Sequence, residues 1–281
     1  MLSEFAPAKI NLFLSVIKKR EDGYHNIGTM FHAISCGDVL FGEQSKLGEI
    51  SISYNKPQEY PPEKDLVYKA AVKLKEMYGV SSGVNFYLEK RLPLGAGLGG
   101  GSSDAAAALR LLNKLWGLNI GLAELEKIGA GLGADVAFLV RGGAALAEGI
   151  GDILTPLKPI DASHCAIVVA TPECSVPTAD AYKNIVPAGE ERWQNFKNSV
   201  LANPDSWDLY NHFEESVLEK YPLISSLKQK LNDCGGKSLL SGSGASVFSL
   251  FGSLEKAIKA CDSVKKECRF LRIANYSLTS M

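Results

Sequence analysis

A glycine-rich segment at residues 93–104 constrains what this chain can fold into more than any other part of its sequence. It reads Pro-Leu-Gly-Ala-Gly-Leu-Gly-Gly-Gly-Ser-Ser-Asp, with five glycines in the seven positions that end at Gly101. Glycine loses more conformational freedom on folding than any other residue, so such a run is expected where the backbone must approach a ligand closely. An apolar helix is predicted directly afterwards, from about Asp104 to Leu115, and a helix N-terminus attracts anions. The segment therefore predicts a phosphate-binding loop.

Three familiar phosphate-binding patterns were compared with the chain, and each fails on a detail. Residues 95–100 and 129–134 match a dinucleotide-binding fingerprint in its strict and looser forms. Pro93 interrupts the strand that should lead into the first, and neither is followed by a clear ribose-binding acidic residue. Residues 236–238 resemble the end of a Walker A loop, but Leu231 stands where that loop requires glycine.

Composition narrows the choice of partners. The chain has 281 residues, 46% hydrophobic and 22% charged, and its formal net charge is −1. These values are typical of a globular protein, and they favour neither a nucleic-acid nor a membrane-surface partner. No apolar run approaches the length needed to span a bilayer. The N-terminal charges follow the apolar stretch 10–17, which is the wrong polarity for a signal peptide.

The six cysteines lie at positions without metal-ligand spacing. They are Cys36, Cys165, Cys174, Cys234, Cys261 and Cys268, and none forms a C-x-x-C pair. Scattered cysteines of this kind indicate reduced thiols in the cytoplasm rather than a disulfide framework or a zinc site. His32, His164 and His212 show no ligand spacing either, and we interpret them as structural.

Strand and helix signals alternate through both halves of the chain. Strands are predicted at 10–17, 84–92, 166–170 and 247–251, with weaker ones at 39–41 and 49–54. Helices are predicted at 65–78, 104–115, 122–132, 179–185, 218–231 and 254–267. A stretch rich in glycine and alanine at 142–151, followed by Pro156, suggests a boundary between domains at 1–155 and 156–281. The pattern predicts an α+β protein built of two-layer α/β units.

Three blocks in order resemble the motifs of the GHMP kinases, the superfamily of galactokinase, homoserine kinase, mevalonate kinase and phosphomevalonate kinase. The blocks are residues 7–12 (Pro-Ala-Lys-Ile-Asn-Leu), 93–107 and 240–248. Gly23-Tyr24-His25, the triple glycine before Ser102, and residues 133–136 followed by Phe138 resemble the branch that phosphorylates a cytidyl diphosphate substrate. The resemblance implies an N-terminal α/β nucleotide-binding domain, a C-terminal ferredoxin-like domain and an active site in the cleft between them.

The resemblance also implies a function. The chain is expected to be an ATP-dependent kinase that phosphorylates the 2-hydroxyl of 4-diphosphocytidyl-2-C-methyl-D-erythritol, in the non-mevalonate route to isoprenoid precursors. ATP is the expected cofactor, with Mg²⁺ bound as MgATP rather than held in an all-protein cage. The expected partner is this small-molecule cytidyl diphosphate substrate. No nucleic acid, membrane or resident metal is expected, and the choice between monomer and homodimer stays open.

The residue roles follow from the resemblance, position by position. Lys9 and Asp135 are the expected catalytic pair, with Asp135 as general base. The expected ATP-binding residues are Pro93, Gly95, Ala96, Gly97, Leu98, Gly99, Gly100, Gly101, Ser102 and Ser103. The expected substrate-binding residues are Asn11, Tyr24, His25, Thr178 and Tyr182, and the small residues of 241–246 are expected on the substrate side. Ser103 is also a candidate Mg²⁺ ligand.

Plainer interpretations stand beside these. Asp135 is also a good N-cap residue, Lys9 could be a lysine on an edge strand whose head reaches solvent, and Tyr182 could simply pack a helix. Another GHMP kinase, acting on homoserine or mevalonate, is an alternative function. A catalytically silent nucleotide-binding protein is the alternative from a different class.

Overall fold

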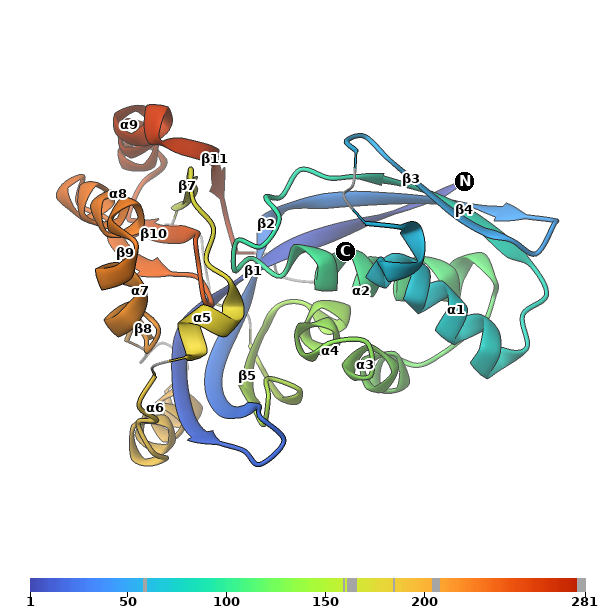
Figure 1. The fold of residues 1–281 in the computed structure, drawn as a ribbon, viewed down its shortest axis with the longest axis horizontal. Coiled ribbons are helices and arrows are strands. Elements are labelled where there is room, and N and C mark those ends of the chain that lie inside the picture. The colour runs from blue at the N-terminus through green and yellow to red at the C-terminus, as the bar shows by residue number, and fades with distance from the viewer. Residues whose placement is uncertain (58–59, 159, 161–165, 184, 204–207, 277–281) are drawn as a thin grey trace.

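Two β-sheets, each with helices packed on it, form the two halves of the structure (Figure 1). This computed structural model describes residues 1–57, 60–158, 160, 166–183, 185–203 and 208–276. Cys165 and His164 lie outside the described residues. Mixed strands and helices in both halves confirm the predicted α+β class.

The first sheet has seven strands. They are β1 (Leu2–Lys19), β2 (His25–Ser45), β3 (Ile50–Tyr54), β4 (Gly83–Glu89), β5 (Ala144–Glu148), β6 (Ile153–Leu157) and β8 (Tyr210–Asn211). Their order is β3-β4-β2-β1-β8, and β5 and β6 extend the sheet from β2. The strands β1 and β2 pair along nearly their whole length and run past the second half to a hairpin near α5 and α6 (Figure 1).

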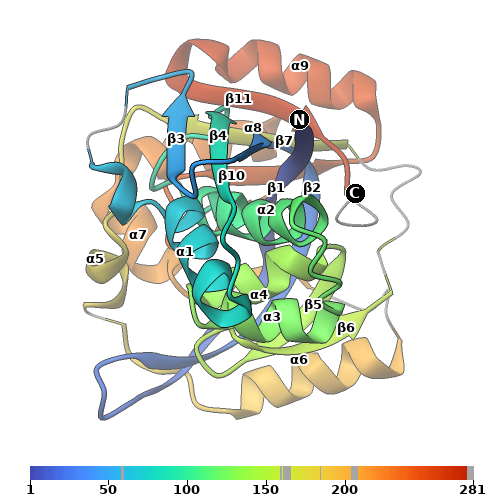
Figure 2. The same cartoon turned by 90° about the vertical axis from the view of Figure 1, so that its right-hand side faces the viewer.

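Four helices pack on one side of the first sheet (Figure 1 and Figure 2). They are α1 (Leu66–Tyr78), α2 (Gly100–Leu115), α3 (Leu122–Ala130) and α4 (Ala134–Arg141), preceded by the short 3₁₀ helix η1 (Pro62–Lys64). The helix α1 contacts β3, α2 packs on β1 and β2, and α3 and α4 pack against α2. In α1, the Asp65 side chain caps the first turn and Gly79, at φ 63°, ends the last. Small side chains let α2 pack closely, because Ala105 to Ala108 are all fully buried.

The second sheet has four antiparallel strands in the order β11-β7-β10-β9. They are β7 (Ala166–Pro172), β9 (Lys237–Leu240), β10 (Val247–Phe251) and β11 (Cys268–Ala274). The helices of this half are α5 (Thr178–Tyr182), α6 (Glu191–Ala202), α7 (Glu214–Lys220), α8 (Pro222–Asp233), α9 (Leu254–Val264) and η2 (Lys265–Glu267). With α8 and α9 packed on the strands, the β-α-β-β-α-β sequence is the ferredoxin-like arrangement that was predicted.

Three differences from the sequence predictions concern the glycine-rich loop, the helices after residue 213 and the two long strands. The helix after the glycine-rich loop begins at Gly100 rather than near Asp104, so the last glycines belong to its first turn. One predicted helix, 218–231, is two, because Pro222 lacks an N–H and holds the residue before it out of the helical region. The β1 and β2 strands are far longer than predicted. The predicted domain boundary, between residues 155 and 156, lies within β6, which pairs with β5, and it stays a prediction.

Candidate active site

A cavity of about 1030 Å³ lies where the two halves meet. Its walls come from β1, the β1–β2 hairpin, the glycine-rich loop, α4, α5 and the loop 242–244. Among the residues predicted from the sequence, the cavity is lined by Lys9, Asn11, Tyr24, His25, Pro93, Gly95, Ala96, Gly97, Leu98, Gly99, Gly100, Gly101, Ser102, Asp135, Thr178 and Tyr182. The volume is at the upper end of small-molecule sites, which suits two substrates bound together.

The glycine-rich loop is held against the second half of the molecule. The Ser241 hydroxyl donates to the Gly97 carbonyl at 2.9 Å, and the Ser246 N–H donates to the Ala96 carbonyl at 3.1 Å. At Gly97 φ is +76°, and a Cβ there would lie 2.0 Å from the Ser241 carbonyl oxygen. Glycine at this position is therefore required by both conformation and space.

The loop opens into α2 as predicted for an anion site. Gly99, at φ +70°, is the N-cap residue, and no side chain caps the helix. The N–H groups of the first turn have no acceptor within the helix, so they can donate hydrogen bonds to an anion in the cavity. The helix dipole favours negative charge at the same place. Gly100, Gly101 and Ser102 line the cavity at this turn.

Ser103 does not take part in this site as placed by the structure. Its side chain is fully buried, and its hydroxyl donates to the Pro7 carbonyl at 2.7 Å. On the helix, Ser103 faces β1 rather than the cavity, because one residue along α2 rotates the side chain by about 100°. The Ser103 side chain thus does not line the cavity, and its contact with ATP or Mg²⁺ stays a prediction, whereas Ser102 lies at the cavity wall.

Lys9 and Asp135 come together at the floor of the cavity. Lys9 Nζ lies 3.7 Å from Asp135 Oδ2, and the two side chains are 6% and 29% exposed. The Lys9 head does not reach solvent along a sheet edge, so the edge-strand interpretation is wrong. Asp135 is the second residue of α4, whose N-cap is Gly133, so the N-cap interpretation is wrong as well.

Lys9 is held on several sides. Its Nζ donates to Asn11 Oδ1 at 2.8 Å and lies 5.4 Å from the centroid of the Phe31 ring. A Cβ on Gly99 would lie 3.0 Å from Lys9 Cγ, so the loop packs directly on the lysine stem. The ammonium group therefore has a fixed position from which its remaining N–H bonds face Asp135 and the cavity.

Aromatic side chains gather at a second part of the cavity wall, formed by the β1–β2 hairpin and α5. The rings of His25 and Tyr182 stack with their centroids 4.8 Å apart, and Tyr182 meets Phe213 edge-on at 4.7 Å. Tyr24 is 62% exposed. Thr178, at the start of α5, lies with its hydroxyl 3.3 Å from that of Ser243. The structure therefore brings the predicted residues of the hairpin and of α5 to one place.

The protonation of these groups follows from their surroundings. Burial and the nearby Lys19 charge lower the pKa of His25, so its imidazole is neutral at pH 7. Burial and the Asp135 charge raise the pKa of Tyr182 to about 12. A neutral imidazole and a phenol both donate and accept hydrogen bonds, which suits the polar edge of a base.

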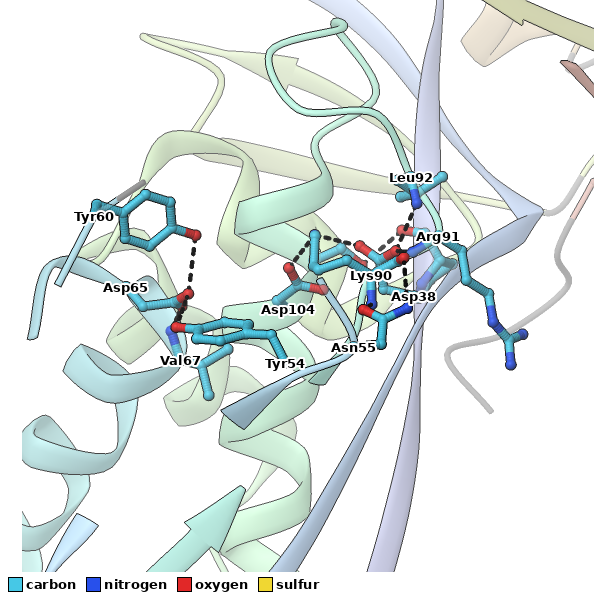
Figure 3. Close-up of polar contacts among 12 residues, drawn as sticks. Asp38, Tyr54, Asn55, Tyr60, Asp65, Val67, Lys90, Arg91, Leu92 and Asp104 are labelled. Carbon is cyan, nitrogen blue, oxygen red and sulfur yellow. Dashed lines mark hydrogen bonds and ion pairs between the residues drawn. The ribbon is translucent and has the colours of Figure 1, made fainter. Parts of the chain in front are cut away.

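A buried charge cluster that the sequence analysis missed lies beside the glycine-rich loop (Figure 3). Lys90 Nζ donates to Asp38 and, at 2.5 Å, to Asp104. The other oxygen of Asp38 accepts the N–H groups of Arg91 and Leu92. Burial acts to lower the pKa of Lys90, but the two carboxylates raise it overall, and burial raises that of Asp104. The cluster fastens the chain that enters the loop to the helix that leaves it.

The carboxylate of Asp65 is fully occupied (Figure 3). It accepts the Val67 N–H at 2.8 Å and the hydroxyls of Tyr54 at 2.9 Å and Tyr60 at 3.1 Å. Burial and the Asp65 charge raise the pKa of Tyr60 to about 12. The next residue, Leu66, lines the cavity. The Asp38–Lys90–Asp104 cluster was missed because Asp38 and Lys90 are 52 residues apart in the sequence.

No group of three or more His, Cys, Asp or Glu side chains suited to a metal occurs in the part of the chain that the structure describes. The five cysteines among the described residues are all unpaired. No helix of the described residues is long and apolar enough to cross a membrane.

Comparison with known proteins places this geometry in a family. Residues 65–143 match the GHMP kinases N-terminal domain, and residues 186–269 match the GHMP kinases C-terminal domain. A 4-diphosphocytidyl-2-C-methyl-D-erythritol kinase of Thermodesulfovibrio yellowstonii is 42% identical over 92% of this chain and 93% of its own. One of Clostridium botulinum is 39% identical over 93% of this chain and 95% of its own.

Solved structures agree. A 4-(cytidine 5′-diphospho)-2C-methyl-D-erythritol kinase superposes with a TM-score of 0.81 at 32% identity, over 98% of this chain and 99% of that one. A homoserine kinase from Cytophaga hutchinsonii shares the fold, with a TM-score of 0.76 at 21% identity over 100% of this chain and 95% of that one. The chain therefore belongs to the GHMP kinases and, within them, to the family of the 4-diphosphocytidyl-2-C-methyl-D-erythritol kinases.

Proposed function

We propose that this protein transfers the γ-phosphoryl group of ATP to the 2-hydroxyl of 4-diphosphocytidyl-2-C-methyl-D-erythritol, a step towards isoprenoid precursors. The observation that carries the proposal is one cavity that joins an anion-binding loop, the Lys9–Asp135 pair and an aromatic cluster. The first suits the phosphates of ATP, the second an attacking hydroxyl, and the third a nucleobase. The relatives named for this reaction support the choice of substrate.

The N–H groups at the start of α2 hold the nucleotide phosphates. Phosphoryl transfer depends mainly on positioning and charge stabilisation, and backbone N–H donors supply both without reorganising. Gly99 to Ser102 bring these donors to the cavity wall. Mg²⁺ bound to ATP neutralises phosphate charge, and the Ser102 hydroxyl is the loop side chain placed to contact the phosphates or a water of that ion.

Lys9 and Asp135 act on the transferring group. The substrate oxygen forms a bond to the γ-phosphorus while the bond from that phosphorus to the β–γ bridging oxygen breaks, and ADP leaves. The hydroxyl proton passes to the Asp135 carboxylate, the acceptor that faces the cavity. Lys9, whose ammonium lies 3.7 Å from that carboxylate, stabilises charge on the phosphoryl oxygens.

The aromatic cluster selects the substrate. Tyr24 and Tyr182 present ring faces on which a pyrimidine stacks, and His25 presents a neutral imidazole to its polar edge. Asn11 and Thr178 line the space between the cluster and the catalytic pair. A nucleobase clamp has no use with homoserine or mevalonate, so this end of the cavity favours the cytidyl substrate over those alternatives.

The test is ADP release from MgATP with 4-diphosphocytidyl-2-C-methyl-D-erythritol, measured beside homoserine, mevalonate and galactose. The proposal expects turnover with the cytidyl substrate alone. Turnover with another substrate instead would be consistent with a GHMP kinase but would reject the role of the aromatic cluster as a nucleobase clamp. Nucleotide binding without turnover of any of the four would favour a silent nucleotide-binding protein. We place the reaction in the cytoplasm, on the strength of the unpaired cysteines.

A further inference from the structure

We infer that Thr29 is a positioning residue for the reaction, acting on Lys9 through Asn11. The inference rests on the proposed role of Lys9. Thr29 lies in β2, is 0% exposed and is not among the residues that line the cavity. Any effect of this side chain on turnover must therefore pass through a neighbour.

Two hydrogen bonds link Lys9 to Thr29 through Asn11, and a third anchors Thr29 to the backbone. Lys9 Nζ donates to Asn11 Oδ1 at 2.8 Å, and Asn11 Nδ2 donates to Thr29 Oγ1 at 2.8 Å. Thr29 Oγ1 in turn donates to the Phe13 carbonyl oxygen at 2.6 Å. All three bonds are buried and of ordinary length.

The direction of every bond in this chain is fixed by chemistry. An ammonium group only donates and a backbone carbonyl only accepts, so the two ends of the chain have one possible polarity. The Asn11 amide must turn its oxygen to Lys9 and its NH₂ to Thr29. The Thr29 hydroxyl must accept from Asn11 and donate to Phe13. Thr29 thereby supports the orientation of the Asn11 amide that the lysine requires.

Local backbone structure brings these groups into line. A β-bulge shifts the pairing of β1 with β2 between Asn11 and Phe13, at the point where the hydrogen-bonded chain crosses from one strand to the other. Bulges re-aim side chains and often lie beside functional sites. The chain links Lys9 to the backbone of its own strand, which fixes the ammonium group more firmly than packing of its flexible stem would.

Removing the Thr29 hydroxyl should release the Asn11 amide. Its NH₂ group would lose a buried acceptor, and rotation of the amide would turn donors toward the donor-only ammonium of Lys9. Lys9 would then leave its place beside Asp135. The KM for ATP should change little, because the phosphate loop is untouched, whereas the KM for the cytidyl substrate can rise because Asn11 lines its side of the cavity.

The experiment compares Thr29→Val, which keeps shape and removes the hydroxyl, with Thr29→Ser, which keeps the hydroxyl. We expect Thr29→Val to lower kcat about tenfold or more, the effect of one buried hydrogen bond left unmade, with the KM for ATP within about twofold. Thr29→Ser should restore kcat. The matched control is Ser249→Ala, which removes a buried hydroxyl bonded to Ser238 at 2.9 Å, away from the cavity.

A double-mutant cycle tests the route through Asn11. In an Asn11→Ala background, Thr29→Val should lower kcat no further, whereas an independent structural defect would add its full effect. Should Thr29→Val not fold, Thr29→Cys asks the same question with a weaker donor and acceptor. Unchanged kcat in the folded variant, or additive losses in the cycle, would overturn the inference.

Lys9→Met separates this inference from the proposed function. Loss of turnover in Lys9→Met with normal turnover in Thr29→Val would reject only the role of Thr29. Normal turnover in Lys9→Met would instead reject the proposed role of Lys9 and the inference together.

Discussion

The two ends of the cavity are built in opposite ways. At the phosphoryl end Lys9 is 5% exposed, and its neighbours are fixed by buried hydrogen bonds from several segments. At the base end, Tyr24 is 62% exposed on a hairpin, and His25 and Tyr182 meet only through their rings. Hydrogen bonds require fixed geometry, whereas stacked rings tolerate adjustment. The site is therefore rigid where charge moves and adaptable where a base is selected.

The largest effect is expected from a substitution at the phosphoryl end of the cavity. Asp135→Asn keeps the size of the side chain and removes its basic oxygen, so kcat should fall about 10²–10⁴-fold, the usual contribution of a positioned base. The KM for the cytidyl substrate should change little, because the base end is intact. Steady-state kinetics check both values. Wild-type kcat in the folded variant would remove Asp135 from the mechanism.

The second-largest effect compares the loss of a buried ion pair at the phosphoryl end with the loss of an exposed ion pair at the base end. Lys90→Met leaves Asp38 and Asp104 buried without a cation, and we expect a loss of about 3–5 kcal/mol in the free energy of unfolding, measured in urea. Adding Asp104→Asn to this variant should recover part of the loss.

The matched pair at the base end is Asp180–Lys220, whose side chains are 36% and 58% exposed. Lys220→Met should leave the urea midpoint within error of the wild type, because solvent screens that pair. Equal losses in Lys90→Met and Lys220→Met would contradict the contrast between the two ends.

A smaller effect is expected from His25→Ala. It removes a ring and a hydrogen-bonding edge from the base end, so the KM for the cytidyl substrate should rise up to about tenfold, the equivalent of one hydrogen bond. The KM for ATP and the kcat at saturation should stay within twofold. A parallel rise in both KM values would place His25 outside the base site.

The smallest effect is a pH dependence of the same residue. Burial lowers the folded-state pKa of His25 below its usual 6.5, so its neutral form persists as the pH falls past that value. The KM for the cytidyl substrate should therefore be flat from pH 8 to about 6.5 and rise only at lower pH. In His25→Ala this rise should disappear. A rise that begins above pH 7 in the wild type would contradict the neutral imidazole.

Local sequence signals predicted a large part of this molecule. The pattern of elements predicted the α+β class, and the resemblance to the GHMP kinases implied the ferredoxin-like second half and the family; all three are confirmed. The residue roles stay predictions, although the structure brings all the predicted site residues except Ser103 to one cavity. The position of the domain boundary is also still a prediction.

Features whose cause lies within a few residues follow from the sequence alone. The glycine-rich loop before α2, the Asp65 cap and the Gly79 stop each depend on the local backbone and its nearest neighbours. Resemblance added Lys9 and Asp135, because the family's motifs are themselves short and local.

Which buried polar groups pair with each other depends on the tertiary structure. Ser103 bonds to Pro7, 96 residues away, and Lys90 bonds to Asp38, 52 residues away. A buried polar group must find a partner, but its own sequence neighbourhood does not say which one. The pairing of β1 with β2, and the packing of α2 and α4 on them, made that choice and placed Thr29 behind Asn11 and Lys9 beside Asp135.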